Sequence, residues 1–244
     1  MRICLSSQKY YLKNALYIVS TPIGNLRDIT LRGLDILKRV DIIICENIKI
    51  TKRLLAKYYI DTFLIKYYEH NAQKQIFKII SMLQSGESVA LVSDAGTPLI
   101  SDPGYRLINS VLKAGYNIIP IPGPSSVLAA LVGSNQATDK FYFYGFFPKK
   151  NKIRIEMFFY LKNITSTIIF LESNYRLLET IQHLKKNLGN REITLAKEMT
   201  KSFEEFRYNR LFEFNMNCKS IKGEFVIIVE GLSQFLKYKN KKII

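Results

Sequence analysis

The segment "LVSDAGTPLISDPGY", residues 91–105, concentrates residue types that build ligand-binding loops. An apolar run leads into Asp94, Gly96 and Thr97. These residues offer a carboxylate acceptor, a backbone that a ligand can approach closely, and a hydroxyl. We therefore expect a ligand loop over residues 93–98, although such a string is also typical of a simple turn.

A second Ser-Asp string, residues 101–104, follows almost at once and indicates a different purpose. Ser101 or Asp102 is suited to cap a helix that begins near Pro103, because proline is favoured in the first helical turn. The repetition therefore predicts one ligand loop followed by one helix start.

Two more Gly/Pro loops follow apolar runs, "STPIGNL" at 20–26 and "IPGPSSV" at 121–127. The carboxyl ends of parallel strands meet at one edge of a sheet, where open α/β folds bind ligands. We expect the three loops to converge there on one cleft. The chain has neither a GxGxxG fingerprint nor a GxxxxGK[ST] loop, which disfavours a dinucleotide or P-loop site.

The elements that must position these loops alternate between strand and helix in the first half of the chain. Apolar runs predict strands, and 3.6-residue periodicity predicts helices. The strands are expected at 15–20, 41–45, 62–67, 88–93 and 116–121, with helices opened by Thr30 and at 49–59, 72–84, 104–114 and 125–130. This order predicts an α/β layer with a largely parallel sheet, in which residues 88–93 are central because both faces are apolar.

The second half has a different texture. We expect strands at 140–147, 166–173, 191–199 and 223–231, a helix at 176–188, and a strand with a turn at 204–214, where a helix is the alternative. A boundary near 120–140 separates the two halves. The predicted organisation is an N-terminal α/β domain at 14–125, a C-terminal α/β domain at 136–232 and a basic tail at 233–244.

Composition restricts the function classes. The net charge of +16 and a pI of about 9.7 favour a polyanionic partner such as nucleic acid, although AT-rich coding would also enrich lysine. Three scattered cysteines and two histidines fit neither a disulfide framework nor a metal site. With no long apolar run and no signal-peptide pattern, we expect a cytoplasmic protein without a membrane span.

Read together, five ordered motifs resemble a known family: "YIVSTPIGNLRDIT", "LVSDAGTPLISDPGYRLI", "PIPGPSS", "FYFYGFFPKK" and "KGEFVIIVEG". They are similar to the tetrapyrrole-methylase-like fold. Within it, they resemble the bacterial enzymes that methylate the 2′-oxygen of a cytidine in the decoding centre of 16S ribosomal RNA. The resemblance covers residues 15–231.

The resemblance implies two α/β domains, S-adenosylmethionine held in the cleft between them largely by backbone atoms, and a homodimer that acts on the small ribosomal subunit. By motif match, the implied cofactor-binding residues are Pro22, Asp94, Ala95, Gly96, Thr97, Pro98, Ser125, Ser126, Leu171, Glu172, Ser173, Ala196 to Met199, and Gly223.

The chain departs from the family pattern at two places. Relatives usually read Glu-Asp-Thr-Arg where this chain has Glu46, Asn47, Ile48 and Lys49, which removes a carboxylate, a hydroxyl and a guanidinium. They read Glu-Ser-Pro-His-Arg where this chain has "ESNYR" at 172–176. If the missing groups contact RNA or the reacting hydroxyl, activity is expected to be weaker.

Methyl transfer from a sulfonium needs alignment rather than a metal, but a ribose hydroxyl must lose its proton. Glu46 and Asp94 are the candidate proton acceptors, and either could instead be structural. Basic residues interleaved with aromatics favour RNA phosphates as partners, and the candidates are Arg27, Arg32, Lys49, Lys52, Arg53, Lys149, Lys150 and Lys152.

Two other functions remain open from the sequence. Small-molecule tetrapyrrole methylases usually carry a GxGPGD-type first loop, whereas this chain has "STPIGNL", which favours RNA. A non-catalytic RNA-binding factor is the third possibility, and the departures at Asn47, Ile48 and Asn174 keep it open.

Overall fold

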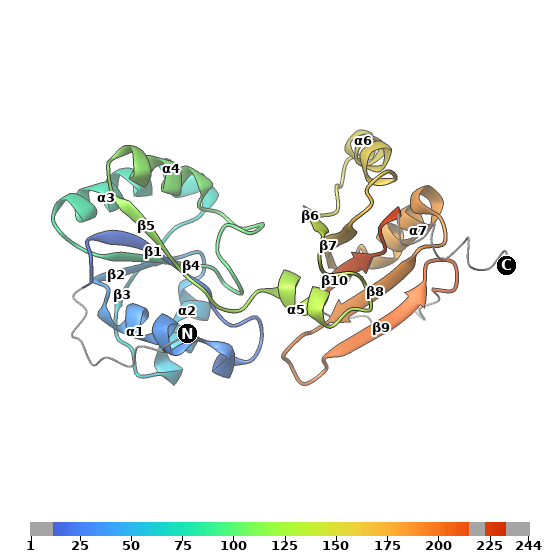
Figure 1. Ribbon diagram of the computed structural model, residues 1–244. Helices are drawn as coiled ribbons and strands as arrows, with labels where there is room; N and C mark the ends of the chain where they lie inside the picture. Colours follow the sequence, from blue (N-terminus) through green and yellow to red (C-terminus); the bar gives the residue numbers. More distant parts are fainter. Residues whose placement is uncertain (1–11, 215–222, 233–244) are drawn as a thin grey trace. The chain divides into compact units, whose positions relative to one another are not determined.

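The computed structural model describes residues 12–214 and 223–232 (Figure 1). The predicted basic tail at 233–244 lies outside the described residues. The chain forms two compact units. The first holds the residues up to Pro22 and Leu26–Pro124, and the second holds Ile23–Asn25 and the residues from Ser125 onward.

A parallel sheet forms the centre of the first unit. Its strands are β1 (Ala15–Val19), β2 (Ile42–Cys45), β3 (Phe63–Lys66), β4 (Val89–Val92) and β5 (Asn117–Ile121). They lie in the order β3-β2-β4-β1-β5, and each neighbouring pair is parallel. All four residues of β4 are buried between β2 and β1, which confirms the prediction of a central strand.

Helices cover both faces of this sheet (Figure 1). On one face pack α1 (Leu31–Arg39) and α2 (Ile48–Lys57), preceded by the 3-10 turn η1 (Leu26–Asp28). On the other face pack α3 (Ala72–Gln84), preceded by η2 (Glu69–Asn71), and α4 (Tyr105–Lys113). The neighbouring strands β2 and β4 therefore lead into helices on opposite faces. In open α/β sheets, ligands bind outside the carboxyl ends of strands at such a point.

The predicted helix starts are right in one case and wrong in another. Thr30 caps α1, and its hydroxyl accepts a hydrogen bond from the Gly33 amide at 3.0 Å. The prediction that Ser101 or Asp102 caps the next helix is wrong, because α4 begins at Tyr105 behind Gly104 and has no side-chain cap. Gly104 takes φ 135° and Ser101 takes φ 63°, whereas an N-cap residue needs extended backbone.

The second unit contains a mixed sheet. Its strands are β6 (Phe141–Phe146), β7 (Thr167–Ser173), β8 (Glu192–Lys197), β9 (Glu205–Arg210) and β10 (Glu224–Val229). Their order is β6-β7-β10-β8-β9. The β6–β7 pair is parallel, and the other pairs are antiparallel. The strand-and-turn prediction for residues 204–214 is confirmed by β9.

Helices also cover both faces of this second sheet. The helices α6 (Asn151–Leu161) and α7 (Leu177–Leu188) pack on one face, and α5 (Ser126–Val132) packs on the other. The sequence did not predict α6, because its apolar residues do not form one stripe: Ile155 and Phe159 are exposed, while Met157 and Leu161 are buried. None of the helices in the described ranges is long and apolar enough to cross a bilayer.

Candidate functional site

The loops after β1 and β4 are joined by backbone hydrogen bonds. The Thr21 amide donates to the Gly96 carbonyl at 2.8 Å, and the Gly96 amide donates back to the Thr21 carbonyl at 2.9 Å. The Thr21 hydroxyl donates to the carbonyl of Ser93 at 3.0 Å. Gly96 takes φ 79°, a left-handed conformation that favours glycine.

The loop after β5 joins the same assembly through Thr97. The Thr97 hydroxyl donates to the Pro124 carbonyl at 3.0 Å and accepts from the Ser20 hydroxyl at 3.2 Å. A Cβ atom on Gly123 would lie 2.9 Å from the Cβ of Ser20, so only glycine permits this close approach. The prediction that the three Gly/Pro loops converge is confirmed within the first unit.

Asp94 links this assembly to helix α2. Its Oδ1 accepts a hydrogen bond from the Asn47 amide at 3.1 Å, and burial raises the pKa of the Asp94 carboxyl above its ordinary value. Asn47 in turn caps α2, because its Oδ1 accepts from the Lys49 amide at 3.1 Å. Asparagine and aspartate are comparable N-caps, so the departure at Asn47 preserves the start of this helix.

A small pocket lies beside these loops at the ends of β2 and β4. Its polar lining comes from Glu46, Tyr67, Ser93 and Asp102, and its apolar walls are Leu91, Val92, Pro98 and Pro103. Its volume of about 10 Å³ is roughly the space needed for one water-sized group. Glu46, one predicted proton acceptor, is exposed at this pocket.

Asp102 is the pocket residue that sequence reasoning assigned to another role. Burial raises the pKa of its carboxyl to about 6, opposed by a hydrogen bond from Ser93 and reinforced by the negative charges of Glu46 and Asp94. The repeated Ser-Asp string was the signal that could have identified it. We interpreted that string as a helix cap.

The predicted cofactor residues of the second unit gather at one end of its sheet. Strand β10 begins just after Gly223, and its Val226 pairs with Leu171 on one side and Ala196 on the other. Ser173 pairs with Glu224, so the carboxyl end of β7 lies beside the start of β10. Helix α5, which is capped by Ser125 and starts at Ser126, packs against the Ala196 and Met199 side chains.

The Glu172 side chain has a structural role within this unit. Its carboxylate is buried and accepts from the Arg176 guanidinium at 2.8 and 2.9 Å and from the Thr180 hydroxyl at 2.6 Å. Arg176 also donates to the Phe147 carbonyl. These partners engage both oxygens of the Glu172 carboxylate, which gives the side chain a structural role in the unit.

All eight predicted RNA-binding side chains are exposed. In the first unit, Arg27 lies in η1, Arg32 in α1, and Lys49, Lys52 and Arg53 in α2. The Tyr58 hydroxyl donates to the Leu26 carbonyl at 2.7 Å, which ties η1 to the end of α2. In the second unit, Lys149 and Lys150 precede α6 and Lys152 lies in its first turn.

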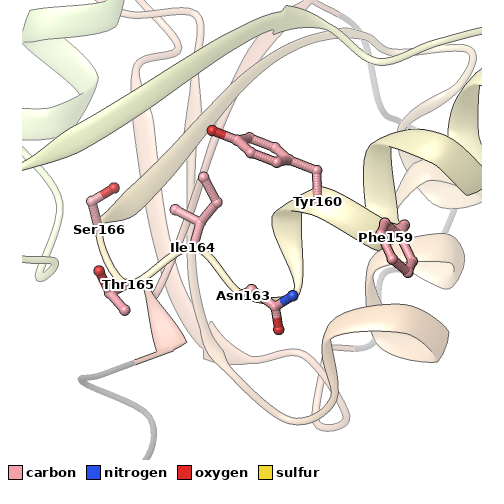
Figure 2. Close-up of a pocket in the computed structure, with 6 residues that line it drawn as sticks. All are labelled: Phe159, Tyr160, Asn163, Ile164, Thr165 and Ser166. Atoms are coloured by element: carbon pink, nitrogen blue, oxygen red, sulfur yellow. The ribbon is translucent and has the colours of Figure 1, made fainter.

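A second pocket, of about 370 Å³, lies in the second unit (Figure 2). Phe159 and Tyr160 at the end of α6 line it, together with residues 163–166 that lead into β7. No carboxylate, lysine or arginine side chain lines it, and none of the predicted site residues does. Its lining does not fit proton transfer or phosphate binding.

The raised pKa of Asp102 predicts how stability depends on pH. A carboxyl whose pKa is higher in the folded state stabilises the fold fully below its unfolded value and loses that contribution as pH rises through about 6. Asp102→Asn should therefore raise Tm at pH 7.5 by a few degrees, since about 1 kcal/mol corresponds to 2–4 °C in a chain of this size. The gain should vanish near pH 4, as measured by calorimetric melting across pH.

The matched control is Asp41→Asn in the same unit. The Asp41 carboxylate accepts two hydrogen bonds from Ser88 at 2.7 Å, so this change should lower Tm. A loss of stability in Asp102→Asn comparable to that of the control would show that the Asp102 carboxylate holds the fold together.

Comparison with known proteins gives the same architecture. The family model for tetrapyrrole (corrin/porphyrin) methylases matches residues 15–215. The ribosomal RNA small subunit methyltransferase I of Rickettsia prowazekii is 45% identical over 95% of this chain and 82% of its own length, and that of Bacillus subtilis is 43% identical over 88% and 75%.

Solved structures share the fold at low sequence identity. The uroporphyrin-III C-methyltransferase of Thermus thermophilus complexed with S-adenosyl homocysteine has a TM-score of 0.63 at 16% identity, covering 91% of this chain and 99% of that chain. A cobalt precorrin-4 methyltransferase has a TM-score of 0.66 at 16% identity, covering 89% and 95%. On this architecture and the family match over residues 15–215, the chain belongs to the tetrapyrrole (corrin/porphyrin) methylase family.

Proposed function

We propose that this protein transfers a methyl group from S-adenosylmethionine to the 2′-hydroxyl of a cytidine in the decoding centre of 16S ribosomal RNA. The observation that carries the proposal is the 45% identity, over 95% of the chain, to a ribosomal RNA small subunit methyltransferase I. The choice of cytidine and of the 2′-oxygen rests on the motif resemblance.

The residues of the converging loops fit the cofactor. The segments 20–26, 93–98 and 122–126 contain no lysine or arginine, although the chain has 36 of them, and Asp94 adds a carboxylate. Such loops suit a ligand with cationic groups better than a phosphate. S-adenosylmethionine carries an ammonium and a sulfonium, and the sulfonium supplies the methyl group. We propose that these loops and the ends of β7, β8 and β10 hold it.

Glu46 and Asp94 are the proposed proton acceptors for the ribose hydroxyl. Asp94 is half-buried, and the Asn47 amide occupies its Oδ1, which fixes the orientation of the carboxylate. Glu46 is exposed next to the pocket and is therefore the more accessible of the two. A carboxylate within about 3 Å of the hydroxyl would suffice for the transfer.

The proposed RNA surface consists of the eight exposed basic side chains on η1, α1, α2 and the start of α6. A net charge of +16 supports attraction to phosphates over the whole protein. We further propose, from the resemblance, that the protein acts as a homodimer in the cytoplasm.

A small-molecule tetrapyrrole methylase is the second candidate, and the two solved structures named above favour it by fold. Their identity of 16% leaves the substrate open, whereas the ribosomal relatives are similar over most of the chain. A non-catalytic RNA-binding factor is the third candidate. Asn47 preserves the cap of α2, which weakens the case for a degenerate site.

A methyl-transfer assay tests the proposal directly. Small ribosomal subunits from cells that lack this enzyme would be incubated with radiolabelled S-adenosylmethionine, and the 2′-O-methyl group mapped by primer extension at low nucleotide concentration. One new stop in the decoding region is expected. Cofactor binding without transfer would point to another acceptor, and the absence of both would favour an RNA-binding factor.

Gly96→Val should abolish cofactor binding, as measured by titration calorimetry. The substitution fills the space beside the loop and strains a residue held at φ 79° between its two hydrogen bonds to Thr21. Gly86→Val is the matched control, because Gly86 also has a positive φ of 90°, but a Cβ atom added there would meet no other atom within 4 Å. If both variants bind the cofactor equally well, residues 93–98 do not contribute to the cofactor site.

Replacing Lys149 and Lys150 with glutamate should weaken binding to small-subunit RNA. Each lost phosphate contact lowers the slope of log affinity against log salt by about one, so a decrease of about two is expected. The control is the Lys74→Glu and Lys78→Glu pair on α3, which changes the net charge equally at exposed positions. Identical salt slopes for the two double variants would place the RNA elsewhere.

A further inference from the structure

Asp102 lies between β4 and α4 and belongs to neither element. It precedes α4 without capping it, since that helix has Gly104 at its N-cap and no side-chain cap. Asp102 instead lines the small pocket with Glu46, Ser93 and Tyr67, and it is partly buried near two other carboxylates. A shielded carboxylate beside like charges is unfavourable unless a proton, hydrogen bonds or a ligand compensate it, and Ser93 supplies one hydrogen bond.

Tyr67 gives a second, independent indication of a ligand. Its side chain is 2% exposed, and its hydroxyl is buried without a hydrogen-bond partner in the described part of the chain. Buried polar groups nearly always have a partner, so an orphaned hydroxyl on a pocket-lining residue needs an explanation. A group that enters the pocket from outside the protein would provide one.

The position of the pocket agrees with this interpretation. Glu46 follows β2, and Ser93 follows β4, the two neighbouring strands whose connections leave for opposite faces of the sheet. Ligands of open α/β sheets bind at such a point, outside the carboxyl ends of the strands. The pocket therefore lies where the topology of the first unit by itself predicts binding.

The lining restricts what the pocket accepts. Carboxylates repel phosphate, and about 10 Å³ admits one small group rather than a nucleobase. Among the described residues, no three His, Cys, Asp or Glu side chains are grouped to hold a metal ion. What remains is a small group that donates a hydrogen bond.

We propose that the pocket of Asp102, Tyr67, Ser93 and Glu46 receives one hydrogen-bond-donor group of the acceptor nucleotide, with the Asp102 carboxylate as its acceptor. This inference rests on the proposed RNA substrate. Two groups of a cytidine have this chemistry, the ribose 2′-hydroxyl and the exocyclic 4-amino group, and carboxylates are suited to accept from the latter.

Two conservative variants separate this role from a structural one. Asp102→Asn keeps the shape and removes the charged acceptor, and Tyr67→Phe removes a hydroxyl that bonds to nothing in the described chain. Both should keep or gain thermal stability while weakening the binding of small subunits by about tenfold, because each removes one hydrogen-bond partner of the bound group. If Asp102 and Tyr67 had only structural roles, both variants would lower thermal stability and leave the binding of small subunits unchanged.

Tyr17→Phe is the matched control. Tyr17 is 3% exposed on β1, and its hydroxyl donates to the Lys13 carbonyl at 3.0 Å. Its loss should lower Tm without changing the affinity for small subunits.

The experiment measures binding of three kinds of small subunit to the wild type and both variants. The subunits carry the unmethylated cytidine, the 2′-O-methylated cytidine, or an unmethylated uridine at the same position. If the hydroxyl is the donor, the wild type should discriminate against the methylated form, and Asp102→Asn should discriminate much less. If the amino group is the donor, the wild type should discriminate against the subunit with uridine, and Asp102→Asn should discriminate much less.

Other outcomes overturn the proposal. Asp102→Asn that binds all three subunits as the wild type does would exclude an acceptor role. A loss of affinity for S-adenosylmethionine in Asp102→Asn, measured by calorimetry, would assign the pocket to the cofactor. If the wild type methylates small subunits but Asp102→Asn binds them equally well, the proposed function stands and this inference fails. If the wild type neither binds nor methylates them, the proposed function and this inference both fail.

Discussion

The paired backbone hydrogen bonds between Thr21 and Gly96 are the constraint on which the rest of the first unit's loop assembly depends. They bring the loop after β1 onto the loop after β4, although 75 residues separate them in sequence, and they require Gly96 to stay at φ 79°. With that pair in place, the Thr97 hydroxyl can bridge Ser20 to the Pro124 carbonyl. Backbone atoms and hydroxyls, rather than charged side chains, therefore join the three loops.

Charge is distributed unevenly in a protein whose net charge is +16. The converging loops lack lysine and arginine, and Glu46, Asp94 and Asp102 lie close enough there for their charges to interact. Exposed basic side chains lie on several helices outside these loops, including α1, α2, α3 and the start of α6.

The two units stabilise their strand ends in different ways. In the second unit, a buried carboxylate is fully matched, since Glu172 meets Arg176 and Thr180. In the first, Asp102 has a hydrogen bond from Ser93 but no ion pair among the described residues, and the Tyr67 hydroxyl has no hydrogen-bond partner there. The contrast is informative because both carboxylates are shielded from solvent to a large degree. Breaking a matched buried ion pair is strongly destabilising, whereas a carboxylate that lines a pocket without a cationic partner is a candidate ligand group.

The sequence by itself determined the parallel sheet of the first unit, because apolar runs predict buried strands. Capping residues predicted the helix starts at Thr30 and Ser125. The motifs predicted the convergence of the Gly/Pro loops and the family resemblance. Only the tertiary structure decided three other features: α6 is a helix without an apolar stripe, Glu172 is engaged by Arg176, and Asp102 lines a pocket instead of capping α4. The role of Asp102 depends on β2 and β4, which lie about 45 residues apart in the chain and become neighbours only on folding. A side chain's role at such a place is set by the neighbours that folding brings, and no local pattern records them.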